Sequence, residues 1–126
     1  MENLPEAELE VLKLLWARGP SSAKEIQNAG RRRKPWARTT VLTLLRRLEE
    51  RGLVEVDRSA FSHRFAAAVD RDQLLDRALG GLAEEYCEGS TLPIMQRLVQ
   101  GRSLSKDEIG ELKALIRQLD RKSKKR

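Results

Sequence analysis

The sequence contains few of the side chains from which an enzyme's active site is built. Its 126 residues include one cysteine, Cys87, one histidine, His63, and no glycine-rich phosphate loop. A catalytic centre or a metal site needs several such groups at fixed spacing. We therefore expect no enzymatic activity, no metal ion and no bound cofactor. A single cysteine also excludes an internal disulfide, and we interpret Cys87 as a packing residue rather than a redox group.

Aromatic residues and long apolar runs are scarce as well. Aromatics make up 4% of the chain, so leucine, valine, isoleucine and alanine must supply the core. No run approaches the roughly 18 apolar residues of a membrane span. The acidic start also lacks the basic and apolar regions of a signal peptide. We expect a cytoplasmic protein without membrane insertion.

Positive charge is abundant but unevenly distributed along the chain. The net charge is +6. Residues 31–64 carry ten basic and four acidic side chains, and the tail 121–126 carries five basic and none acidic, whereas 1–30 and 70–120 are net acidic. A basic region of this kind favours polyanions through counterion release. A solvated basic surface without a ligand is the alternative.

Hydrophobic periodicity predicts three helices in the first half of the chain. The first spans residues 5–17. A capping-box spacing of Ser22 and Glu25 opens a second helix that ends near Ala29, and the third spans residues 37–51. The predicted apolar side of the first helix is Leu9, Leu12, Leu15 and Trp16. The predicted buried side of the third helix is Val41, Leu44, Leu45 and Leu48.

A small hairpin and further helices are predicted in the second half. Residues 53–56 and 63–67 read as two strands joined by a turn. A helix then begins at Asp70, another spans residues 92–100, and a last one, capped by Ser105, ends near residue 121. The predicted fold is mostly α.

Two domains are expected from this order of elements. Residues 1–69 read as a winged helix-turn-helix domain with a two-stranded wing, and residues 70–126 as a helical domain with a basic tail. The second segment is too short to bury its apolar positions alone, so we predict dimerisation. One intramolecular helical domain is the alternative. The predicted dimerisation residues are Leu75, Leu79, Leu82, Tyr86, Ile109, Leu112, Ile116 and Leu119.

The polar side of the third helix is the candidate binding surface. In a helix-turn-helix the second helix of the pair enters the major groove of DNA. The candidate base-contacting residues are Arg38, Thr39, Leu42, Thr43 and Arg46. The candidate phosphate contacts precede this helix or flank the wing turn, and they are Arg31, Arg32, Arg33, Lys34, Arg58 and Arg64. We interpret Trp36 as a packing anchor rather than a stacking platform, and His63 as exposed without a role.

These features are compatible with two kinds of function. The first is a regulator that binds double-stranded DNA. The second is a protein-interaction scaffold whose basic surface binds nucleic acid incidentally. The charge distribution favours the first, and protection of a short palindrome in a footprint distinguishes the two.

Several segments resemble one repressor family. ELEVLKLLW at 8–16, TTVLTLLRRLEERGLV at 39–54, HRF at 63–65 and KDEIGELKALI at 106–116 resemble the penicillinase and methicillin-resistance repressors of the BlaI/MecI type. The resemblance implies a winged-helix domain, a helical dimerisation domain and a homodimer that represses transcription at a palindromic operator. The DNA contacts that it implies are Arg38, Thr39, Thr40 and Thr43, with wing residues near Arg64.

The chain also departs from the family's pattern in ways that bear on mechanism. Leu42 stands where the type members carry a basic residue, so the family's operator sequence is not carried over. The family's cleavage position, an Asn-Phe bond, falls on Arg97 and Leu98. A membrane-bound sensor protease is the partner that the family implies for this bond, and with this substitution the inducing signal stays open. A copper-responsive branch uses a Cys-x-Cys pair, which Cys87 alone cannot form.

Overall fold

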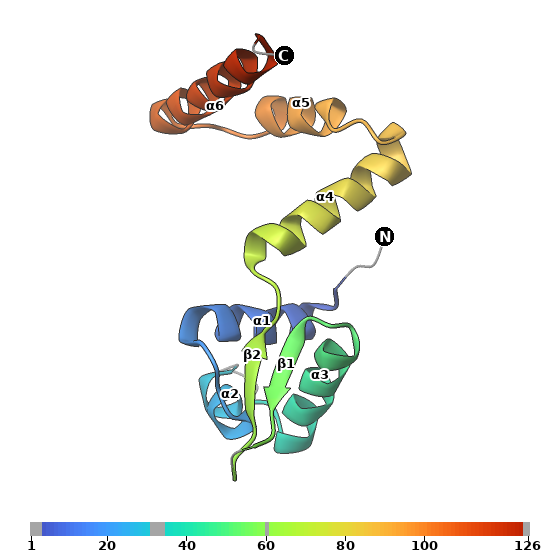
Figure 1. The fold of residues 1–126 in the computed structure, drawn as a ribbon, viewed down its shortest axis with the longest axis vertical. Helices are drawn as coiled ribbons and strands as arrows, with labels where there is room; N and C mark the ends of the chain where they lie inside the picture. The colour runs from blue at the N-terminus through green and yellow to red at the C-terminus, as the bar shows by residue number, and fades with distance from the viewer. Residues whose placement is uncertain (1–3, 31–34, 60, 125–126) are drawn as a thin grey trace. The chain divides into compact units, whose positions relative to one another are not determined.

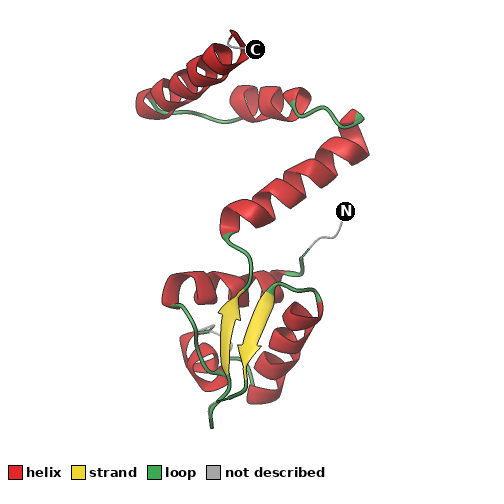
Figure 2. Ribbon diagram, viewed as in Figure 1, coloured by secondary structure: helices red, strands yellow, loops and turns green. Residues whose placement is uncertain are grey.

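The chain folds into two units that are mostly helical. The computed structural model describes residues 4–30, 35–59 and 61–124. The first compact unit is residues 1–82 and the second is residues 83–126. Helices and one antiparallel pair of strands make up the secondary structure of the described ranges (Figure 2). The predicted domain boundary, between residues 69 and 70, coincides with the start of a helix and stays a prediction.

The first unit contains a three-helix core and a β-hairpin wing, as the sequence predicts. The hairpin lies against α1 and α3 (Figure 1). Its strands pair antiparallel, with Val54 opposite Ala67 and Asp57 opposite Arg64. In chain order the elements are α1 (Glu6–Arg18), α2 (Ala23–Ala29), α3 (Arg38–Glu50), β1 (Val54–Asp57) and β2 (Arg64–Ala67).

Local sequence signals explain the ends of α2 and α3. The predicted capping box is confirmed: the Glu25 backbone N–H donates to Ser22 Oγ at 3.1 Å, and the Ser22 N–H donates to Glu25 Oε1 at 3.0 Å. Gly52 follows α3 with φ +75°, a conformation that glycine adopts without strain. The Leu53 N–H then donates to the Leu48 carbonyl at 2.9 Å. The chain thereby leaves α3 directly into β1.

The core confirms the prediction for α3 and corrects the one for α1. All four predicted residues of α3 are buried. In α1 the buried set is Glu8, Val11, Leu12 and Leu15. Trp16 is half-buried and packs against the core as predicted, whereas Leu9 is half-buried outside the core cluster. Glu8 completes the i, i+3, i+4, i+7 stripe, and the prediction failed because carboxylates are normally exposed. Trp16 Nε1 donates to the carbonyl of the buried Val69 at 2.8 Å.

Gly30 permits a close approach between the end of α2 and Trp36. A Cβ atom on Gly30 would lie 2.8 Å from Cε3 of Trp36, and the Trp36 ring is buried. We expect Gly30→Ala to lower the free energy of unfolding by about 1–3 kcal/mol because the ring or the backbone must shift. Urea denaturation measures this effect. Gly80→Ala is the control, since its Cβ meets nothing within 4 Å, and equal midpoints for both variants contradict the packing role.

Three helices follow the wing. They are α4 (Arg71–Cys87), α5 (Leu92–Gly101) and α6 (Lys106–Lys124). The predicted caps are present, with Gln73 N–H donating to Asp70 Oδ1 at 2.8 Å and Glu108 N–H donating to Ser105 Oγ at 3.1 Å. The predicted end of α6 near residue 121 is three residues short, because Lys122 and Lys124 suit the negative end of the helix dipole.

The second unit leaves its apolar side chains uncovered. Ala83 is the one buried residue among those described from 83 to 124, and neither α5 nor α6 contains any. Within the described ranges, no helix is both long enough and apolar enough to cross a bilayer. The exposed large apolar side chains of this unit are Tyr86, Leu92, Met95, Leu98, Val99, Ile109, Leu112, Leu115, Ile116 and Leu119.

Candidate nucleic-acid interface

Helix α3 presents one polar face to solvent and buries the other in the core of the first unit. The predicted base-contacting side chains all lie away from the core. Arg38, Thr39, Thr40, Leu42 and Arg46 are exposed, and Thr43 is half-buried. The structure thus brings these six residues onto one accessible helix, whereas their contacts with a ligand stay a prediction.

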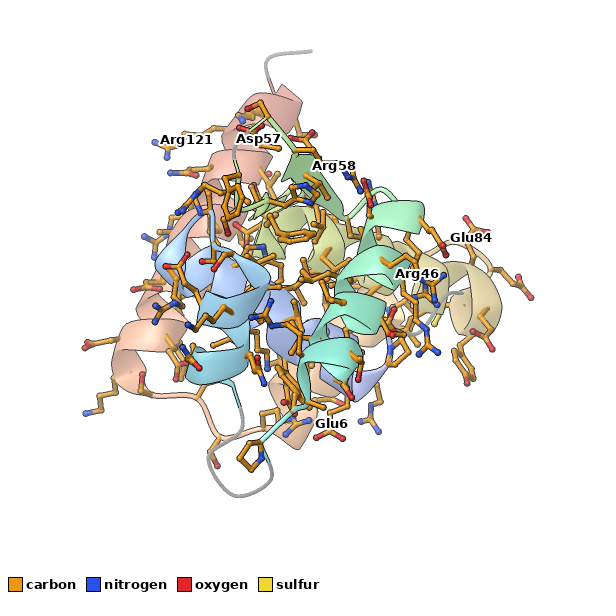
Figure 3. All side chains as sticks on the ribbon, turned by 90° about the horizontal axis from the view of Figure 1, so that it is seen from below. Glu6, Arg46, Asp57, Arg58, Glu84 and Arg121 are labelled. Atoms are coloured by element: carbon orange, nitrogen blue, oxygen red, sulfur yellow. The ribbon has the colours of Figure 1, made fainter. Side chains whose placement is uncertain are left out.

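Two of these polar side chains have partners within α3. Thr43 Oγ1 donates to the Thr39 carbonyl at 2.9 Å, which leaves its lone pairs free to accept a further hydrogen bond. Arg46 forms an ion pair with Glu50 at 3.0 Å. Both side chains of that pair are 62% exposed, and such exposed i, i+4 pairs contribute little to stability. Arg46 can therefore exchange Glu50 for another anion at small cost, and Figure 3 shows it projecting outward from α3.

The predicted wing residue Arg58 ties the wing to the end of α3. Its Nη1 and Nη2 atoms donate to the two carboxylate oxygens of Glu49 at 3.0 and 2.9 Å. The hydrogen bond from Arg58 holds the pKa of Glu49 below its ordinary value, so the carboxylate is charged at neutral pH. Arg58 lies beside Asp57 on the wing in Figure 3. In this structure Arg58 positions the wing and has its guanidinium engaged by protein.

Arg64, the second predicted wing cation, contacts the turn before α2. Its Nη2 donates to the Pro20 carbonyl at 2.7 Å, and its Nη1 lies 3.7 Å from Glu25 Oε1. The Glu25 pKa is lowered mainly by the backbone hydrogen bond at Ser22, with Arg64 as a smaller cause. Arg64 therefore links β2 to the α2 cap and retains about half of its side-chain exposure.

Trp36 and His63 are the two further predicted residues that lie in the described part of this region. Trp36 is buried, which confirms the packing interpretation, and its carbonyl accepts from Gln27 Nε2 at 3.2 Å. His63 is exposed, as predicted. The predicted phosphate contacts at 31–34 lie outside the described residues. Among the residues that are described, no group of three or more His, Cys, Asp or Glu side chains is placed to hold a metal ion.

Sequence reasoning missed two residues at this surface, Lys24 and Phe61. Both line a hollow of about 410 Å³ that also includes Arg38 and Leu42. Lys24 belongs to α2, which the sequence gives no reason to place beside the wing. Phe61 had a recognisable signal, because an aromatic residue in a polar turn between Arg58 and Arg64 has no core to fill.

Comparison with known proteins relates this architecture to one family. The sequence profile described as "Penicillinase repressor" matches residues 4–118, nearly the whole chain. The chain belongs to the penicillinase repressor family. This membership confirms the resemblance found in the sequence. The family consists of DNA-binding transcription regulators with a winged helix, a class of repressors and not of enzymes.

Individual relatives of this repressor family align over most of their length. The methicillin resistance regulatory protein MecI of Staphylococcus aureus (strain N315) is 23% identical over 114 residues, which cover 90% of this chain and 93% of MecI. The transcriptional regulator BlaI of Mycobacterium tuberculosis (strain H37Rv) is 29% identical over 122 residues, 95% of this chain and 87% of BlaI.

A MarR family protein from Bacillus stearothermophilus shares the fold, with a TM-score of 0.52 at 18% identity over 98% of this chain and 77% of that protein.

Proposed function

We propose that this family member is a homodimeric transcriptional repressor that binds an inverted-repeat operator in double-stranded DNA. The observation that carries the proposal is the polar face of α3, which is accessible and lies in the sequence segment 31–64, with ten basic and four acidic side chains. Each α3 enters a major groove, and the two half-sites lie about 34–36 Å apart. We place this activity in the cytoplasm, where the operator is.

The exposed apolar residues of the second unit support dimerisation. Soluble monomers rarely expose apolar patches larger than a few hundred Å². Along α6, Ile109, Leu112, Ile116 and Leu119 fall on one side of the helix at near-heptad spacing, and each is more than one-third exposed. A second copy of the chain offers the same surface, as a two-fold interface requires. Burial of this side of α6 against a partner removes it from water.

Base-contacting residues should affect specific binding most. We expect Arg38→Gln or Thr43→Val to weaken binding to the selected operator by about 1–3 kcal/mol, since each removes one base contact. Fluorescence anisotropy with a duplex selected from a random-sequence library measures the change. Lys13→Gln, which neutralises an exposed cation on α1, is the control. Wild-type affinity in both α3 variants overturns their assignment.

Phosphate contacts should act on all sequences alike. Neutralising Arg31, Arg32 and Arg33 weakens binding to selected and mixed-sequence duplexes equally and lowers the salt dependence by about one unit for each phosphate that is no longer neutralised. A DNase footprint of the wild-type protein tests the proposal as a whole. Protection of a short inverted repeat supports a repressor. Uniform binding without a protected site supports the protein-interaction scaffold instead.

The bond at the family's cleavage position places a requirement on any sensor protease. Arg97 and Leu98 lie on α5 with exposed side chains, and Arg97 Nη2 donates to Gln100 Oε1 at 2.7 Å within the helix. A membrane-bound sensor protease that acts on this bond must accept arginine rather than asparagine before the cut. It must also unwind this turn of α5, because proteases bind extended backbone.

A further inference from the structure

A hollow of about 410 Å³ lies on the first unit between α2, α3 and the wing turn. It is lined by the cationic side chains Lys24 and Arg38, by His63 and by the hydroxyls of Ser22 and Ser62. None of its described lining residues is acidic. The lining therefore offers positive charge and hydrogen-bond donors to a ligand that carries negative charge.

The same hollow contains most of the large apolar side chains that this unit exposes. Three large apolar residues are exposed among those described between residues 4 and 82, namely Leu42, Phe61 and Leu75. Two of the three, Leu42 and Phe61, line the hollow, and Phe61 is fully exposed. An exposed aromatic residue next to cations fits a ligand in which anionic and apolar groups alternate. A nucleic-acid backbone has this chemistry, since phosphates alternate with sugars whose carbon atoms are apolar.

We propose that this hollow seats a segment of DNA backbone next to the major groove that α3 occupies. A phosphate lies against Lys24, where Arg38 on α3 adds positive charge from the base-contacting side, and a deoxyribose packs against Phe61. The proposal rests on the proposed function, because α3 in the major groove places the wing near the adjacent strand. It adds Lys24 and Phe61 to the binding surface and makes Phe61 an apolar anchor.

The charge of the hollow argues against a second copy of the chain as its occupant. In a two-fold contact of hollow on hollow, the second copy would present the same cations, and no acidic residue of the described lining would face them. Burial of Phe61 against a sugar contributes to affinity without neutralising a phosphate. Its contribution is therefore independent of salt, whereas that of Lys24 is not.

Two substitutions with matched controls, all made in the full chain, test this DNA-backbone site. The probes are a duplex carrying the inverted repeat selected from a random library and a mixed-sequence duplex. We expect Phe61→Ser to weaken binding about tenfold with an unchanged salt slope, as for removal of a buried aromatic side chain. We expect Phe61→Trp to retain wild-type affinity. Lys24→Gln should lower the slope of log affinity against log salt concentration by about one unit more than the control Lys13→Gln, as for the loss of one phosphate contact.

Hydroxyl-radical footprinting gives a second readout, because it reports the exposure of individual deoxyriboses. Phe61→Ser should restore cleavage at one or two sugars per half-site beside the α3 contacts. Failure of the wild-type protein to bind either duplex overturns the proposed function itself. If the wild-type protein binds DNA, and Phe61→Ser and Lys24→Gln both have the affinity and salt slope of Lys13→Gln, the backbone site in the hollow is overturned. The proposed function then stands. If these variants change the sedimentation of the protein without changing its affinity for DNA, the hollow is a protein-docking surface and the backbone site is overturned.

Discussion

A chain with aspartate at both Leu112 and Ile116 of α6 is expected to bind a full inverted repeat about 10²–10⁴-fold more weakly than the wild-type chain. Dimerisation converts binding at the second half-site into an intramolecular event. A monomer loses that advantage, although each α3 keeps its contacts. Both side chains are exposed in the single chain, at 38% and 64%, so the substitutions act on association rather than on the fold of one chain.

The matched control places the same charges on the opposite side of α6. Ala114→Asp with Gln118→Asp has the same i, i+4 spacing and the same added charge, and should leave both association and affinity near wild type. Sedimentation equilibrium measures the association, and anisotropy with half-site and full-site duplexes measures the affinity. A dimer in the Leu112 and Ile116 variant, or equal losses in both double variants, contradicts an interface on this side of α6.

Leu45→Ala is expected to produce the largest loss of stability, about 2–5 kcal/mol. Leu45 lies on α3 and is completely buried in the core of the first unit. Alanine removes the contacts of Leu45 and leaves a cavity. The helices around this position cannot all move inward to fill it. Because a small unit of this kind is only marginally stable, such a loss unfolds a large part of the population at physiological temperature.

Leu42→Ala on the same helix is the control for this stability change. Leu42 is 44% exposed, so its truncation should change the free energy of unfolding by less than about 1 kcal/mol. Urea denaturation followed by tryptophan fluorescence measures both variants, since Trp16 and Trp36 belong to the first unit. Similar losses in the two variants would show that burial does not distinguish the two faces of α3.

Periodicity and capping signals were sufficient to predict the elements of the fold. The four buried residues of α3, the Ser22–Glu25 capping box and the two strands depend on local spacing, which the sequence displays directly. The fold's assignment to a winged helix follows from their order. These signals depend on neighbours within one or two turns, so no knowledge of tertiary contacts was needed.

Features that depend on tertiary contacts were not predicted. Glu8 completes the buried stripe of α1 although its residue type favours solvent. The ion pair of Arg58 with Glu49 joins residues nine positions apart on different elements. Lys24 and Phe61 line one hollow only because the chain folds the wing turn back beside α2. No periodicity in the sequence indicates such contacts between distant residues. The residues next to Glu8, Lys24 and Glu49 in the sequence give no local signal of them either.

The uncovered apolar side of α6 has a consequence for how repression responds to the amount of protein. If two chains must meet to cover it, the concentration of paired chains rises with the square of the chain concentration while most chains are single. Occupancy of the operator then changes more steeply than the level of synthesis. A modest fall in expression, or removal of α6 from a fraction of the chains, would thus release the operator over a narrow range of protein abundance. The helix that pairs the chains would then set the threshold at which the gene is switched.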